Sequence, residues 1–244
     1  PHSDPEMKNV VLGVSGSVAA YRACDLARDL VRAGCEVRVC LTDGAQRFVS
    51  PALFEALTGQ PCLTDAFEEP QCGRMAHIEW ARAADVLLIA PATANVMNKI
   101  ANGYADDMLT TIALAYEGRL VVAPAMNPSM FANESTQRAL SVLRARASVV
   151  VEPSEGTVAC GEQGQGKLAS NEQIVLAVLS VLNVSALLEG KRVVVSSGPT
   201  EEPIDDVRVL TNRSSGKMGA AVARAALLMG ADVTIVAGPQ RAAL

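Results

Sequence analysis

Three side chains in this sequence are candidates for a catalytic site: His77, Asn127 and Cys160. His77 is the one histidine after Met7, and an imidazole titrates near neutral pH. A lone histidine is more often structural than catalytic, Asn127 can simply stabilise a turn, and Cys160 can be an incidental loop residue. If the three meet in one site, the imidazole and the thiol can transfer protons and the amide can hold a ligand by hydrogen bonds.

The segment 152–169 interrupts the regular pattern of the chain with Gly156, Gly161, Gly164 and Gly166. Such a glycine-rich stretch predicts a mobile loop, and long loops in compact domains are often lids over a site. Cys160 lies in this segment, so its thiol would enter the site when the loop closes.

Apolar runs alternate with helical patterns along the chain. The predicted strands are 8–14, 36–41, 85–90, 120–123 and 146–151. The predicted helices are 17–33, 95–101, 108–116, 134–143 and 171–182. Two of the strands should stop at Pro91 and Pro124, which cannot donate to a ladder. This alternation predicts an α/β fold with a doubly wound parallel sheet covered by helices on both faces.

Ligands of open α/β sheets bind at the carboxyl ends of the strands. Small residues, including Gly16, follow the first predicted strand and would let backbone N–H groups approach a phosphate, although a tight turn explains them equally well. Thr42 follows the second strand. The adjacent Asp43 is an acid of the kind that binds the ribose of NAD, so an NAD site remains an alternative. Thr93 follows the third and would cap a helix. Asn127 follows the fourth.

Composition excludes several functions. The 244 residues carry a net charge of −5 without a basic block, which argues against nucleic acid as a partner. No apolar run reaches the roughly 18 residues of a membrane span, and no signal peptide is visible. The six cysteines form no CxxC pair, so we expect no metal site. Cys24, Cys35 and Cys40 lie in apolar patterns and should be buried thiols in a reducing cytoplasm.

Five segments fall in the order found in the homo-oligomeric flavin-containing cysteine decarboxylases. They are GSVAA (16–20), PATAN (91–95), GYADDML (103–109), PAMNPSM (124–130) and ACG (159–161). The chain therefore resembles this family, and most closely its members that act on phosphopantothenoylcysteine in coenzyme A biosynthesis. The family often has Trp after the last Met of PAMNPSM, where this chain has Phe131.

The resemblance continues into a second segment. SGPTEEPID (197–205) and NRSSGKMG (212–219) are similar to the start of phosphopantothenate–cysteine ligase, which uses CTP and Mg²⁺ and is fused behind the decarboxylase in bacteria. We therefore expect a decarboxylase domain over 7–190 and the first β-α-β unit of a second, Rossmann-like domain over 191–244. The ligase domain would be cut short and the chain without ligase activity.

The resemblance implies FMN as cofactor and a phosphorylated small molecule as substrate. The residues it places around FMN are Gly16, Ser17, Val18, Thr42, Gly44, Thr93, Ala94, Asn95 and Ala125. The residues it places around the substrate are Asn127, Met130, Thr157, Ala159, Gly161, Gly164, Gly166 and Lys167. His77 would be the base, Asn127 would hold the substrate carboxylate and Cys160 would return a proton. The resemblance also implies a trimer or an assembly of trimers.

Three alternatives remain from the sequence. One is a flavoprotein that decarboxylates peptides with a C-terminal cysteine, and the ligase-like segment argues against it. Another is a non-catalytic regulatory flavoprotein, which would not need His77, Asn127 and Cys160 together. The third is an NAD(P)-dependent enzyme, which the weak glycine pattern leaves open.

Overall fold

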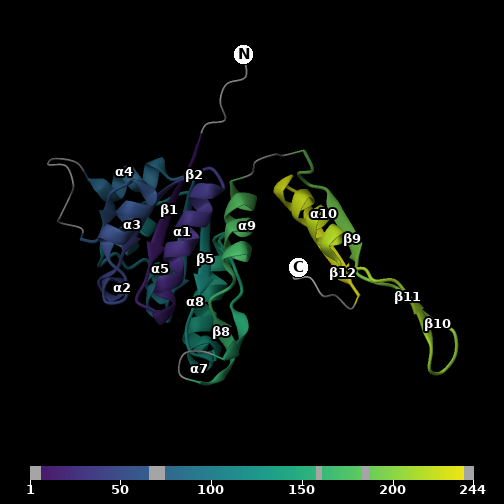
Figure 1. Cartoon of the computed structure of the whole chain (residues 1–244). Coiled ribbons are helices and arrows are strands. Elements are labelled where there is room, and N and C mark those ends of the chain that lie inside the picture. The colour runs from purple at the N-terminus through teal and green to yellow at the C-terminus, as the bar shows by residue number, and fades with distance from the viewer. Residues whose placement is uncertain (1–6, 66–74, 158–160, 183–186, 239–244) are drawn as a thin grey trace, which may run out of the picture. The chain divides into compact units, whose positions relative to one another are not determined.

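The computed structural model describes residues 7–65, 75–157, 161–182 and 187–238. The chain divides into two compact units, Pro1–Val181 and Leu182–Leu244. The first unit contains a sheet covered by helices, and the second contains a shorter strand–helix–strand arrangement (Figure 1).

A parallel sheet of six strands forms the centre of the first unit. Its strands are β1 (Lys8–Val14), β2 (Cys35–Leu41), β3 (Cys62–Leu63), β4 (Val86–Ala92), β5 (Leu120–Pro124) and β6 (Val149–Val150). They lie in the order β3-β2-β1-β4-β5-β6, so the direction of winding reverses between β1 and β4. The predicted doubly wound α/β fold is confirmed, and the reversal marks where such folds bind ligands.

Helices cover both faces of this sheet, as parallel strands buried on both sides require. The helices are η1 (Val18–Tyr21), α1 (Arg22–Arg32), α2 (Asp43–Gln46), α3 (Pro51–Thr58), α4 (Ala76–Ala83), α5 (Ala94–Asn102), α6 (Met108–Ala115), α7 (Pro128–Ala132), α8 (Glu134–Ala145) and α9 (Asn171–Val181). Helix α1 packs with α3 and α9, while α4, α5, α6 and α8 pack with one another (Figure 1). Within the described residues, no helix is long and apolar enough to span a bilayer.

The predicted ends of two strands were wrong. Strand β4 continues through Pro91 to Ala92, and β5 includes Pro124. The register of the β4–β5 pair shifts between Ile89 and Ala92. This irregularity accommodates Pro91, which has no N–H to donate. The strands therefore carry Thr93 and Ala125 further toward the carboxyl edge than the sequence suggested.

The predicted loop over 152–169 contains a hairpin instead. Strand β7 (Ser154–Thr157) pairs antiparallel with β8 (Gln163–Lys167). Gly156 and Gly164 face each other across the hairpin, both with φ 153°, a conformation that other residues rarely adopt. The glycines that suggested a loop thus build a two-stranded hairpin whose pairing comes from the backbone.

The second unit has a parallel pair of strands, β9 (Arg192–Ser197) and β12 (Asp232–Ala237), with α10 (Lys217–Leu228) between them in the chain. An antiparallel hairpin of β10 (Glu201–Pro203) and β11 (Val209–Thr211) precedes α10. The sequence predicted the strand–helix–strand part and missed this hairpin.

Candidate functional site

Buried hydrogen bonds tie together the loops that follow β1 and β4. Ser15 is fully buried, and its hydroxyl donates to the carbonyl oxygen of Pro91 at 2.7 Å. The Ser15 Oγ in turn accepts from the backbone N–H of Thr93 at 2.9 Å. The N–H of Ala125, after β5, donates to the carbonyl of Ala92 at 3.0 Å. Ser15 therefore fixes the point where the sheet reverses, a role that sequence reasoning did not assign.

The loops after β1 and β2 meet through two glycines. A Cβ on Gly16 would lie 2.9 Å from both the Cα and the carbonyl carbon of Gly44, so only backbone fits at this contact. The Thr42 hydroxyl, 8% exposed, accepts from the N–H of Ala45 and caps α2. The result is a small-residue surface at the carboxyl edge of the sheet, where backbone can approach a ligand closely.

A cavity of about 450 Å³ opens beside this surface. Its lining comes from the start of η1 and α1, the loop after β5, and the hairpin. The lining residues are Ser17, Val18, Ala19, Tyr21, Arg22, Ala125, Met126, Asn127, Thr157, Gly166, Lys167 and Leu168. We call this space the hairpin cavity. Seven of the predicted site residues meet in it: Ser17, Val18, Ala125, Asn127, Thr157, Gly166 and Lys167.

The Asn127 side chain has a fixed orientation in the hairpin cavity. Its Oδ1 accepts from the backbone N–H of Ser129 at 2.8 Å and caps α7. Its Nδ2 therefore faces the other way and donates to Oε2 of Glu162 at 2.8 Å. A side chain held like this presents an amide donor to a carboxylate.

The hairpin docks closely onto the loop that carries Asn127. The Met126 N–H donates to the Gly166 carbonyl at 2.9 Å. A Cβ on Gly166 would overlap the carbonyl oxygen of Met126, and a Cβ on Gly164 would lie 2.9 Å from the Cβ of Pro128. Two of the predicted site glycines are thus places where only glycine lets the hairpin reach the loop.

Replacing Gly166 by alanine should push β8 away from this loop. Overpacking of this kind costs about 1–3 kcal/mol. In this variant the cost weakens the docking of β8 onto the loop that contains Met126. We expect the Met126 amide to exchange with deuterium at least tenfold faster, since about 1.4 kcal/mol is a factor of ten. The exposed neighbour variant Gln163→Ala is the control. Unchanged exchange at Met126 in Gly166→Ala would contradict the docking.

Arg22 holds the base of the hairpin against α1. Its guanidinium donates to the carbonyl oxygens of Leu168 at 2.8 Å and Ala169 at 3.0 Å. Arg22 also lines the hairpin cavity. Sequence reasoning passed over this residue because its partners lie far away along the chain.

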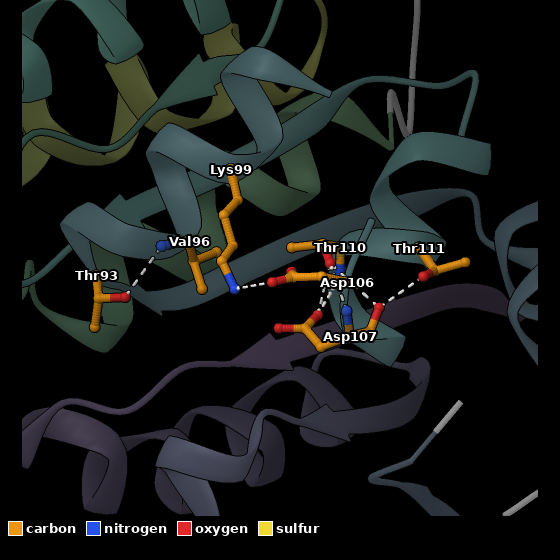
Figure 2. Close-up of polar contacts among 7 residues, drawn as sticks. All are labelled: Thr93, Val96, Lys99, Asp106, Asp107, Thr110 and Thr111. Atoms are coloured by element: carbon orange, nitrogen blue, oxygen red, sulfur yellow. Dashed lines mark hydrogen bonds and ion pairs between the residues drawn. The ribbon is translucent and has the colours of Figure 1, made fainter. Parts of the chain in front are cut away.

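The segment 103–109 orders the helices next to the predicted FMN residues (Figure 2). Thr93 caps α5 by accepting from the Val96 N–H. Lys99 of α5 pairs with Asp106 at 2.8 Å, and this hydrogen bond lowers the pKa of Asp106. Asp107 caps α6 reciprocally with Thr110. The acidic pair therefore positions helices, and Ala94 and Asn95 form the first turn of α5.

His77 lies near the start of α4 and is not among the residues that line the hairpin cavity. Its Nδ1 is buried and has no hydrogen-bond partner in the part of the chain that the structure describes. A buried nitrogen without a partner is costly, so we expect a group beyond the described residues to complete its surroundings. Met130 is 50% exposed on α7. Gly161 precedes β8, while Ala159 and Cys160 lie outside the described residues.

Burial makes the described cysteines poor nucleophiles. Cys35 and Cys40 are buried as predicted, whereas Cys24 is only partly buried. Burial raises the pKa of the Cys40 thiol well above its usual range and that of Cys62 to about 12. Thiols with raised pKa values form little thiolate at neutral pH.

Comparisons with known proteins show the family of this chain. Residues 1–183 match the family described as Flavoprotein, and residues 188–244 match the DNA/pantothenate metabolism flavoprotein C-terminal domain. The coenzyme A biosynthesis bifunctional protein CoaBC of Bacillus subtilis is 48% identical over 234 residues, which cover 95% of this chain and 58% of that protein. The chain thus spans less than two thirds of that relative.

Two solved structures resemble the first unit. A PPC decarboxylase mutant complexed with pantothenoylaminoethenethiol is 32% identical with a TM-score of 0.63, and the match covers 71% of this chain and 97% of that one. The FMN binding protein AtHal3 is 34% identical with a TM-score of 0.63, and the match covers 71% of this chain and 95% of that one.

Proposed function

Because the chain belongs to the flavoprotein family, we propose that it is an FMN-dependent decarboxylase of 4′-phospho-N-pantothenoylcysteine, with 4′-phosphopantetheine as product. The observation that carries this proposal is the fixed amide of Asn127, which presents a donor inside a cavity built from the β1 loop and the hairpin. The PPC decarboxylase and the CoaBC relative support it. The second family match favours it over decarboxylation of peptide cysteines.

The residues at the carboxyl edge fit a flavin phosphate and ring. Gly16 and Gly44 leave a surface that a Cβ would fill, and Ser17 lies at the start of a helical turn. Val18 and Ala125 add apolar surface beside it. We propose that these residues hold FMN, with Thr42, Thr93, Ala94 and Asn95 around it. When bound, FMN would supply a reversible two-electron acceptor, which would allow the substrate thiol to be oxidised to a thioaldehyde and later restored.

Each of the proposed site residues then has its own role in the decarboxylation. Direct loss of CO₂ would leave an unstabilised carbanion, whereas the thioaldehyde accepts the electron pair and becomes an enethiolate. Asn127 holds the substrate carboxylate in the geometry for CO₂ loss. His77 removes a proton as the thiol is oxidised. Lys167, exposed at the cavity rim, meets the substrate phosphate, and Met130 packs beside the substrate.

Cys160 is proposed to give a proton to the enethiolate in the last step. Replacing Cys160 by serine should leave oxidation and CO₂ loss in place and stall the return to a thiol, because a hydroxyl is a much weaker acid. Mass spectrometry should then find a product lighter than the normal thiol by a pair of hydrogens. Cys62→Ser is the matched control, since burial raises the pKa of the Cys62 thiol to about 12. Normal product at the normal rate from Cys160→Ser would contradict the role.

We also propose that the active form is a homo-oligomer, a trimer or an assembly of trimers, in the cytoplasm. The Nδ1 of His77 is buried without a partner among the described residues, and His77 is not among the residues that line the hairpin cavity; both observations support a site completed by a second copy of the chain. For the full-length protein we propose the additional synthesis of phosphopantothenoylcysteine from phosphopantothenate, cysteine and CTP with Mg²⁺. We expect no such ligation by residues 191–244 alone.

A visible spectrum of the purified protein tests the cofactor. We expect a bound flavin that chromatography after acid release identifies as FMN. A colourless protein that fails to take up added FMN would overturn the proposed function.

A further inference from the structure

The substrate-binding amide of Asn127 is already occupied by a carboxylate of the protein itself. Glu162 directly precedes β8, and its Oε2 lies 2.8 Å from Nδ2 of Asn127. The opposite side of the same amide is fixed by the Ser129 N–H at 2.8 Å. The amide therefore cannot flip without losing its cap on α7, so a second carboxylate would have to approach Nδ2 beside Glu162.

We propose that Glu162 is an internal competitor of the substrate carboxylate. Its carboxylate occupies Asn127 when the site is empty, and the substrate displaces it. The inference rests on the proposed function, because it takes Asn127 as the group that binds the substrate carboxylate. Glu162 then acts as a specificity-determining residue that lowers the affinity for any ligand with a carboxylate at this position.

The chemistry of the two carboxylates supports this exchange. A side-chain carboxylate and the carboxylate of a cysteine amide accept the same hydrogen bond from an amide N–H. Two such anions within a few ångströms repel each other, so they cannot both remain at Asn127. Glu162 is exposed, so its carboxylate can move into water when the substrate arrives.

The exchange predicts a difference between ligands with and without a carboxylate. The product, which has lost its carboxylate, does not compete for Asn127 and leaves Glu162 in place. After CO₂ loss, Glu162 would return to the amide of Asn127. The product could then stay bound, while a new substrate carboxylate would again have to compete with Glu162. Glu162 would thus discriminate between substrate and product without touching the reacting carbon.

Binding of two unreactive probes to the FMN-loaded protein tests the proposal. Phosphopantothenoylserine has the carboxylate but no thiol to oxidise, and phosphopantothenoylethanolamine lacks both. Calorimetry should show that Glu162→Ala binds the serine probe about three- to tenfold more tightly, as expected for one exposed hydrogen bond. Affinity for the ethanolamine probe should not change. Glu162→Gln keeps a neutral acceptor and should show a smaller gain, and Gln163→Ala should show none.

Each outcome of these binding measurements supports or overturns the competitor role of Glu162 or the proposed function. A gain confined to the serine probe supports the competitor. Equal gains for both probes would show that the contact merely holds the hairpin, and unchanged or weaker binding of the serine probe would overturn the proposal as well. Failure of the wild-type protein to bind either probe would instead overturn the proposed function.

Discussion

Replacing Asn127 by aspartate is expected to lower the rate of CO₂ release from phosphopantothenoylcysteine by about a hundredfold or more. An aspartate oxygen can still accept from the Ser129 N–H, so α7 keeps its cap. The other oxygen replaces the Nδ2 donor, and it repels the substrate carboxylate instead of binding it. The variant should fold and retain flavin, and quantified CO₂ release gives the result.

Asn133 provides a matched control for this substitution. It caps α8 by accepting from the Ser135 N–H at 3.0 Å, as Asn127 caps α7, but it does not line the hairpin cavity. Asn133→Asp should therefore release CO₂ at the wild-type rate. Full activity in Asn127→Asp would remove the carboxylate-binding role, and an equal loss in Asn133→Asp would show that capping alone explains the effect.

Replacing His77 by asparagine is expected to slow reduction of the flavin by substrate by about 10²–10⁴-fold, the range for loss of a general base. The side chain is partly buried at the start of α4, and asparagine is smaller and uncharged, so the core around Trp80 should persist. Anaerobic stopped-flow absorbance follows the bleaching of the flavin directly. Bleaching at the wild-type rate would exclude His77 as the base.

Mixing the two inactive variants tests whether the site is shared between copies. If His77 of one copy serves the hairpin cavity of its neighbour, co-expression of His77→Asn with Asn127→Asp gives both intact residues to about a quarter of the sites in a cyclic oligomer. If both residues serve the cavity of their own chain, no site regains both. Recovery of about a quarter of the activity therefore supports a shared site, and negligible recovery excludes it.

The sequence predicted the elements with strong, bounded apolar patterns. The run 8–14 became β1, because it is rich in Val and is buried along most of its length. Helices α5, α6 and α8 were predicted to within two residues at each end, since Thr93, Asp107 and Asn133 cap them.

The errors come from features that local patterns do not record. Strand β3 has two residues and exists because it pairs with β2, and the short helices α3 and α4 give too few repeats for a periodic signal. The hairpin was mistaken for a loop because its pairing involves glycines, whose lack of side chains hides any alternation. Packing against the Met126–Pro128 loop then decides its position.

Some residues of the candidate site could likewise be predicted from the sequence, and others could not. Ser17, Asn127 and Lys167 were predicted from motifs, and the structure brings them to one cavity. Arg22 and Glu162 were missed because their partners, Leu168 and Asn127, are distant in the chain and only the folded structure brings them together. We propose that His77 joins them through a second copy of the chain, an arrangement that a single sequence does not specify.

Anaerobic incubation of the FMN-loaded protein with phosphopantothenoylcysteine tests the central claim most directly. The account predicts one CO₂ released for each phosphopantetheine formed, no added oxidant consumed, and a flavin spectrum that returns to its starting form. Substrate recovered unchanged from a protein that holds FMN would contradict the account, as would CO₂ release that continues after the flavin has been removed.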